Sequence, residues 1–192
     1  MTHKGTVTLE TNRLILRRFA MDDLEQIYNN CWSDVEVWKW TNYKPMHCIE
    51  DVIYIADMFT EKWLGAYDKP NRYSWAIQLK SSSEVIGRFF GMYPDDRLSQ
   101  VELAYELGQK WWGQGLMTEA VIRVIDFFFG EVGFNRIQSH HAFDNPASGK
   151  VMQKSGMKYE GTMRQACISN NGLFDKVNFA ILANDYFRVI KN

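Results

Sequence analysis

The sequence predicts an α/β (α+β) domain built on a central mixed, mostly antiparallel sheet of about seven strands, flanked by about four helices. Alternating apolar runs at 72–80, 84–93 and 98–107 are separated by short polar turns, which is typical of an antiparallel meander. After Gly115 the apolar residues recur at helical spacing, and strand-like and helix-like patterns then follow one another. These two observations together favour a mixed fold.

Length and composition favour a single domain, which we place at residues 9–188. The chain has 192 residues, 46% hydrophobic and 23% charged, which is enough to bury a core. A formal net charge of −1 offers no field that attracts nucleic acid or a membrane, so neither is expected as a partner. The three cysteines are far apart and the first residues lack an apolar run. We therefore expect no metal site, no disulfide framework and a cytoplasmic location.

The N-terminal third should supply one strand and two helices. The first strand is expected within 9–19, and Asp22 then begins a helix. The tryptophan-rich stretch 31–45 has no regular pattern. A second helix is expected at 49–64, with Gly65 just past its end.

The C-terminal half alternates between helix and strand patterns. In chain order we expect a helix after Gly115, a strand at 136–143, a helix at 146–155, and hairpin strands at 157–168 and 173–183. The helix after Gly115 should bury one face, formed by Met117, Ala120, Val121, Val124 and Phe128. Asn145 is expected at the N-cap of the next helix, with Pro146 at its first position.

The stretch 101–120 joins an alternating strand to an amphipathic helix through a loop that contains Gly108, Gly113 and Gly115. A strand followed by a glycine-rich turn and a helix N-terminus presents free backbone N–H groups to a phosphate. Glycine suits this role because a residue without Cβ lets the main chain curl tightly around a bulky anion. The stretch therefore predicts a phosphorylated cofactor.

Two common phosphate motifs do not match this loop. A P-loop needs Lys and Ser or Thr after its last glycine, where this chain has Gln114 and Gly115. A dinucleotide fingerprint needs a third glycine where Thr118 stands, and it belongs at the first turn of a parallel sheet. Acyl-coenzyme A is the remaining alternative.

The residues K-W-W-G-Q-G at 110–115 resemble the signature of the GNAT N-acetyltransferase superfamily, which reads Gln or Arg, two variable residues, Gly, any residue, and Gly or Ala. Their surroundings more narrowly resemble the branch of ribosomal-protein N-terminal alanine acetyltransferases. Three further motifs match that branch in order: L-E-T-N-R-L-I-L-R-R-F at 9–19, V-I-G-R-F-F-G at 85–91 and N-P-A-S-G-K-V-M-Q-K-S-G-M-K-Y-E-G-T-M-R at 145–164. Lys110 departs from the signature, since it offers a charge without the fork of Arg.

The resemblance implies acetyl-CoA as the acyl-donor substrate. Backbone amides at 113–117 would hold its pyrophosphate, helped by the positive end of the following helix. Backbone groups at 105–107 would pair with the pantetheine arm, and Asn145 would bind that arm or the acceptor side, although a plain N-cap role also explains it. The residues expected to bind the donor are Tyr105, Glu106, Leu107, Lys110, Trp112, Gly113, Gln114, Gly115, Leu116, Met117, Thr118 and Asn145.

Transfer of an acetyl group to an amine needs a base, because an ammonium has no lone pair. Glu102 resembles the glutamate that begins this strand in the family branch and is the expected base; a solvated strand carboxylate is the alternative. Ser148 matches the position of a general acid near the thioester sulfur, or is a surface serine. His140 and His141 are weaker candidates, and as strand neighbours at most one of them should face the cleft. Cys167 is expected to be a buried thiol.

The acceptor side should come from the stretch 32–65 and from the hairpin near 170–175. Candidate walls of an acceptor pocket are Trp32, Trp38, Trp40 and Tyr43, with burial in the core as the alternative for these aromatic residues. Candidate charges for an ammonium are Asp34, Glu36 and Asp175. The leading hypothesis is a protein N-terminal α-amine. The alternatives are a small-molecule amine such as an aminoglycoside or polyamine, and a non-catalytic acyl-CoA-binding domain. A homodimer is compatible with the sequence, which sets no oligomeric state.

Overall fold

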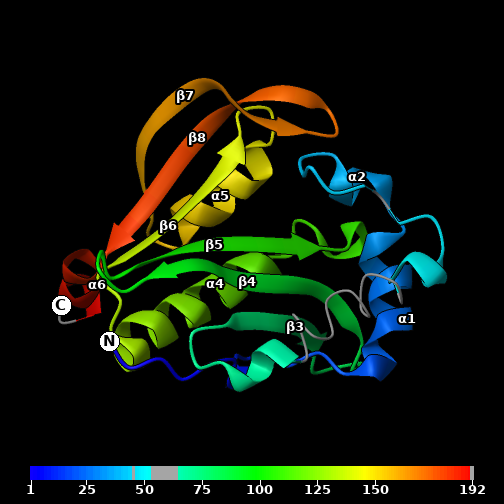
Figure 1. Cartoon of the computed structure of the whole chain (residues 1–192), viewed down its shortest axis with the longest axis horizontal. Coiled ribbons are helices and arrows are strands. Elements are labelled where there is room, and N and C mark those ends of the chain that lie inside the picture. Colours follow the sequence, from blue (N-terminus) through cyan, green and yellow to red (C-terminus); the bar gives the residue numbers. More distant parts are fainter. Residues whose placement is uncertain (45, 53–64, 191–192) are drawn as a thin grey trace.

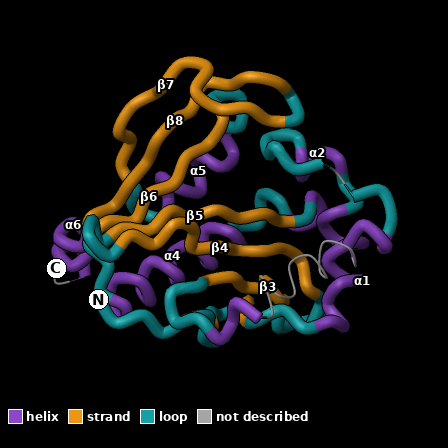
Figure 2. The backbone as a smooth tube through the Cα atoms, viewed as in Figure 1, coloured by secondary structure: helices purple, strands orange, loops and turns teal. Residues whose placement is uncertain are grey.

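The computed structural model describes residues 1–44, 46–52 and 65–190, and its strands form one eight-stranded sheet (Figures 1 and 2). Neighbouring strands follow the order β1-β2-β3-β4-β5-β6-β8-β7. They are β1 (Leu9–Glu10), β2 (Leu14–Arg17), β3 (Tyr73–Leu79), β4 (Val85–Asp95), β5 (Gln100–Leu107), β6 (Arg136–Ala142), β7 (Lys158–Ser169) and β8 (Gly172–Leu182). All pairs are antiparallel except β5 with β6, which confirms the predicted mixed sheet.

Helices and short helical turns connect these strands. The α-helices that lie wholly within the described residues are α1 (Leu24–Ile27), α2 (Val35–Trp38), α4 (Leu116–Phe127), α5 (Pro146–Lys154) and α6 (Ala183–Ile190). Tight 3-10 turns lie at Met21–Asp23, Gly65–Asp68 and Gln109–Trp111, and π-helical turns at Tyr28–Trp32 and Phe128–Val132. The helix expected at 49–64 begins at Ile49, but residues 53–64 lie outside the described residues.

The sequence missed three elements. The stretch 9–19 holds two strands rather than one, because the Thr11 amide donates to the Leu14 carbonyl at 3.0 Å and reverses the chain. The short helix α2 lies in the stretch that showed no pattern. Helix α6 follows directly from β8, so its start is not marked by a turn.

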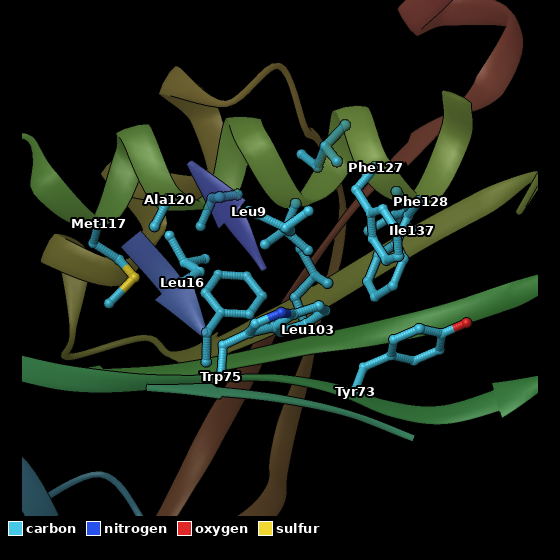
Figure 3. Close-up of a cluster of buried hydrophobic side chains, with 14 of the residues drawn as sticks. Leu9, Leu16, Tyr73, Trp75, Leu103, Met117, Ala120, Phe127, Phe128 and Ile137 are labelled. Carbon is cyan, nitrogen blue, oxygen red and sulfur yellow. The ribbon is translucent and has the colours of Figure 1, made fainter. Parts of the chain in front are cut away.

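Helix α4 packs along one face of the sheet and supplies much of the main core (Figure 3). Its predicted apolar face is confirmed, since Met117, Ala120, Val121, Val124 and Phe128 are all buried. In Figure 3 the helix residues Met117, Ala120 and Phe128 point toward the sheet, where the labelled strand residues include Leu16, Trp75 and Leu103. Full burial of each large apolar side chain contributes about 1.5–3 kcal/mol, so this interface anchors the helix that follows the glycine loop.

A second core cluster lies on the other face of β3. Trp75 and Ile77 point toward α4, whereas Ala76 between them packs with Trp32 and Trp38. Both tryptophans are only 1% exposed, and Nε1 of Trp38 donates to the Trp32 carbonyl at 2.6 Å. The expectation that Trp32 and Trp38 wall an acceptor pocket is therefore wrong. They fill the core beneath the helical N-terminal segment.

Candidate functional site

Strands β5 and β6 are paired at only one end, which leaves a cleft between them. Their parallel register ends at Glu102 opposite Gln138, although both strands continue further. Just beyond this point Oγ of Ser139 donates to the Leu103 carbonyl at 2.8 Å. Figure 1 shows β6 diverging from β5. A cavity of about 1340 Å³ lies there, which is large for a small-molecule site.

The predicted site residues converge on this one cavity. Every predicted catalytic and donor-binding residue lines it except Lys110 and Gln114, which lie beside it. Nζ of Lys110 stands 4.9 Å from the ring centroid of Trp111, and Nε2 of Gln114 donates to the Lys110 carbonyl at 3.0 Å. Nε1 of Trp112 donates to the Leu107 carbonyl at 2.6 Å. These side-chain bonds hold the loop in shape.

The glycine loop connects β5 to α4 at the edge of the cavity. Gly113 and Gly115 have φ angles of +74° and +76°, in the left-handed region that other residues adopt at a cost. Gly108 is required for a different reason, because a Cβ there would lie 1.9 Å from the Asn30 carbonyl oxygen. Since α4 begins at Leu116, the amides of its first turn have no acceptor within the helix. This geometry suits a phosphate group.

Glu102 faces the cleft and is hydrogen-bonded to β6. Its Oε1 lies 2.9 Å from Nδ1 of His140, and Nε2 of Gln138 donates to its Oε2 at 3.4 Å. The bond from His140 lowers the pKa of the Glu102 carboxyl, although burial opposes this shift. Glu102 is thus ionised at neutral pH and is joined to a second group that can carry a proton.

Glu106 shares a strand face with Glu102, but its carboxylate has protein partners. It pairs with Arg88 and accepts a hydrogen bond from Nε1 of Trp32 at 3.1 Å. The Arg88 and Glu106 side chains are only 7% and 11% exposed. The Arg88 guanidinium also lies over the Trp32 ring, with Cζ 4.9 Å from its centroid. The carboxylate of Glu106 therefore ties the N-terminal segment to β5.

Three predicted residues meet at the start of α5. Asn145 stands at the N-cap position, yet its side chain makes no capping bond; instead Nδ2 donates to Oγ of Ser148 at 3.3 Å. The hydroxyl of Tyr105 donates to the Ser148 carbonyl at 3.3 Å. Burial raises the pKa of Tyr105 far above its ordinary value, so this phenol is neutral. The plain N-cap alternative for the Asn145 side chain is therefore not realised here.

Both histidines of β6 line the cavity, contrary to the expectation that at most one does. The cavity opens where the strands separate, so it is bounded by both faces of β6. His141 contacts helix α5 and not Glu102, since a Cβ placed on Gly149 of α5 would lie only 2.6 Å from Nε2 of His141. Nδ1 of His141 lies 2.7 Å from the Ala142 carbonyl oxygen. Burial lowers the pKa of His141.

The acceptor-side residues expected from sequence are only partly brought together. Glu36 and Trp40 line the cavity. Asp34 instead caps α2, accepting from the Glu36 amide at 2.9 Å. Asp175 accepts from the Gln165 amide at 2.8 Å, in a bulge of β7 where Gln165 has a φ of +45°. Cys167 is partly exposed and lines the cavity, so the expectation of a buried thiol is wrong.

Hydrogen bonds from Asn170 join the β7–β8 turn to the loop after α2, and we call this contact the clasp. Nδ2 of Asn170 donates to the carbonyls of Trp38 and Tyr43 at 2.9 and 2.6 Å. The backbone N–H of Asn170 also donates to the Thr41 carbonyl at 2.7 Å. The clasp thereby joins two segments that are far apart in the sequence and that both supply residues to the cavity lining. Loop length and composition gave no signal for this contact.

The described residues contain neither a group of metal-ligating side chains nor a membrane-spanning helix. Within 1–44, 46–52 and 65–190, no group of three or more His, Cys, Asp or Glu side chains is arranged to hold a metal ion. None of the helices in this part of the chain is long and apolar enough to cross a membrane.

A cleft between diverging strands, beside a glycine loop and a helix N-terminus, suits an extended ligand that carries a phosphate group. The family model described as an acetyltransferase (GNAT) domain matches residues 13–158. The chain belongs to the GNAT acetyltransferases, and it is an acetyl-CoA-dependent enzyme of that family.

Individual relatives agree with this assignment. N-acetyltransferase p20 of Bacillus licheniformis is 31% identical over 179 residues, 93% of this chain and 98% of that protein. The [ribosomal protein uS5]-alanine N-acetyltransferase of Escherichia coli is 30% identical over 105 residues, 55% of this chain and 50% of that protein. The crystal structure of the microcin C7 self-immunity acetyltransferase MccE with acetyl-CoA and AMP shares the fold, with a TM-score of 0.77 and 20% identity over 90% of this chain and 93% of that one.

Proposed function

We propose that this acetyltransferase acts on the N-terminal α-amine of a protein. The observation that carries the proposal is the Glu102–His140 pair in the cleft, because an amine acceptor must lose a proton there. The choice of a protein N-terminus rests on the 30% identity with the ribosomal-protein alanine acetyltransferase. The mixed lining of Glu36, Lys39 and Trp40 also favours it, since a polycationic acceptor would favour a strongly acidic wall.

The Glu102–His140 pair is proposed to accept the proton of the acceptor ammonium. With Nδ1 of His140 donating to Glu102, the second imidazole nitrogen of the neutral ring carries a lone pair. Glu102 then fixes this tautomer and balances the charge that forms on the ring. The freed amine attacks the acetyl carbonyl carbon; a C–N bond forms, the C–S bond breaks, and the second proton that the nitrogen loses replaces the proton that the Ser148 hydroxyl gives to the leaving thiolate.

Ser148 is proposed to donate a proton to the leaving thiolate. Its Oγ already accepts a hydrogen bond from Asn145, so its O–H proton is available for another acceptor. Ser148 also lines the cavity. Asn145 is thereby proposed to orient Ser148.

The donor is proposed to lie along β5 and the glycine loop. Beyond Glu102 the cleft side of β5 lacks a strand partner, so its backbone groups at 105–107 can pair with an extended pantetheine arm. The positive φ of Gly113 and Gly115 and the first turn of α4 suit the pyrophosphate. Lys110 is proposed as a charge at the rim of this site.

The test is an acceptor panel with wild type, Glu102→Gln, His140→Gln and Ser148→Ala. Thiol release from acetyl-CoA is measured with peptides that begin in alanine or serine, a polyamine and an aminoglycoside. We expect turnover with peptides, and losses of about 10²-fold or more in the variants. Glu160→Gln is the matched control: its carboxylate is also ion-paired on a strand, with Arg136 at 2.8 Å, but lies outside the cavity lining.

Each other outcome has a defined meaning. Turnover only with the polyamine or aminoglycoside would replace the protein acceptor by a small-molecule amine. Tight binding of coenzyme A without turnover on any amine would contradict catalysis. Losses below about tenfold in both Glu102→Gln and Ser148→Ala would refute these roles.

A further inference from the structure

Arg13, from the turn between β1 and β2, reaches the glycine loop. Its Nη1 donates to the Gln114 carbonyl at 3.0 Å. Its Nη2 is the nearest atom to a Cβ placed on Gly115, at 3.7 Å. The guanidinium therefore lies against the residues whose amides face the proposed pyrophosphate site.

Arg13 also binds Glu119 in the first turn of α4. The Arg13 amide donates to Oε1 of Glu119 at 2.9 Å, and its Nε donates to Oε2 at 2.7 Å. The Arg13 side chain is 48% exposed and that of Glu119 is 21% exposed. Burial alone would raise the pKa of Glu119, but hydrogen bonds from Thr11 and Arg13 outweigh it and lower that pKa. Glu119 is thus an ionised carboxylate at neutral pH.

This placement of Glu119 poses an electrostatic problem for donor binding. A carboxylate in the first turn stabilises the helix itself, because it faces the positive end of the helix dipole. The same negative charge repels a pyrophosphate bound at that end. An arginine held on the carboxylate removes most of this repulsion while leaving the helix amides open.

We infer that Arg13 is a positioning residue for the donor's pyrophosphate, which neutralises Glu119 and holds the Gln114 carbonyl so that the loop amides stay directed at the phosphates. This inference rests on the proposed placement of the pyrophosphate in the glycine loop. This role requires arginine, because Nε donates to the Glu119 carboxylate while Nη1 donates to the Gln114 carbonyl.

The experiment measures affinity for coenzyme A by calorimetry and for pantetheine, which lacks the phosphates, by NMR titration. Arg13→Gln should weaken coenzyme A binding about tenfold or more, because it leaves the Glu119 charge unpaired, and should leave pantetheine binding unchanged. Glu119→Gln added to Arg13→Gln should restore most of the lost affinity. Arg13→Lys should fall between wild type and Arg13→Gln.

Arg136→Gln is the matched control, since it also removes an arginine from a glutamate, Glu160, outside the cavity lining. It should leave coenzyme A affinity within about twofold. An equal loss of affinity for coenzyme A and pantetheine in Arg13→Gln would overturn the inference, as would no rescue by the second substitution.

The variant Gly115→Val distinguishes the role of Arg13 from the placement of the pyrophosphate in the glycine loop. If Gly115→Val weakens coenzyme A binding and Arg13→Gln does not, only the role of Arg13 is refuted. If neither variant weakens it, the pyrophosphate does not lie in the loop and both are refuted. The identity of the acceptor does not affect these measurements, because each of them measures binding and none measures turnover.

Discussion

Nδ1 of His140 lies 2.9 Å from Oε1 of Glu102, where β5 and β6 separate. This contact joins the only parallel pair of strands among the described residues at the point where they part. It places an ionised carboxylate and an imidazole on one wall of the cavity.

The first prediction concerns acid stability. Because the contact with His140 lowers the pKa of Glu102 in the folded state below its ordinary value of 4.5, the unfolded chain takes up the proton first as the pH falls. The stabilisation is therefore present above about pH 4.5 and is lost as the pH falls through the lowered folded pKa. In urea unfolding at neutral pH and at about pH 3.5, Glu102→Gln should lose less stability than wild type on acidification. Equal losses would contradict this assignment.

The second prediction concerns the left-handed glycine of the loop. Gly115→Val forces a β-branched residue to a φ of +76°, which costs about 1–2 kcal/mol or more and displaces the loop amides. Coenzyme A binding should fall at least tenfold. Gly133→Val is the control, since Gly133 has a φ of +87° but follows the π turn away from the cavity. It should lower the melting temperature with little change in coenzyme A affinity; a similar fall in affinity in both variants would count against the loop.

The third prediction concerns the clasp over the acceptor side. Asn170→Ala removes the side-chain bonds to the Trp38 and Tyr43 carbonyls, so the loop after α2 and the hairpin tip should separate more readily. We expect a rise in KM for the acceptor, with coenzyme A affinity unchanged. Asn171→Ala is the neighbouring control, because the backbone N–H of Asn171 donates to Oγ of Ser169 at 3.1 Å and the substitution keeps this bond. A loss of coenzyme A affinity in Asn170→Ala would show that the clasp acts elsewhere.

The fourth prediction separates a structural role of Glu106 from a donor-binding one. Glu106→Gln removes the carboxylate that pairs with the buried Arg88 guanidinium, and breaking a buried pair typically costs about 3–5 kcal/mol. Chemical unfolding should show a loss of about this size, while coenzyme A affinity per folded molecule changes little. A loss of coenzyme A affinity without a loss of stability would place the carboxylate in the donor site instead.

The parts of the site that are local in sequence could be predicted, and those that depend on distant contacts could not. Gly113 and Gly115 are readable because a positive φ is a constraint on one residue. The period of two correctly places Glu102 and Glu106 on one face. It cannot show that β6 pairs in parallel with β5, which is what brings His140 to Glu102.

Residue type alone also gave a wrong prediction of a pocket wall at two aromatic positions. Trp32 and Trp38 suit a pocket wall and a core equally well, and only the packing of the N-terminal segment against Ala76 decides between them. Similarly, Arg13 and Asn170 carry no local signature of their roles. Their partners lie about 100 or more residues away, beyond the range of any helix or strand period.

The site of acetylation on a protein acceptor tests the proposed function most sharply. Wild type and Glu102→Gln are incubated with acetyl-CoA and ribosomal proteins that carry native N-termini, and the products are mapped by mass spectrometry. We predict one added acetyl group on the N-terminal α-amine with wild type, reduced about 10²-fold in Glu102→Gln. Acetyl groups confined to lysine side chains, or equal yields from the two enzymes, would contradict it.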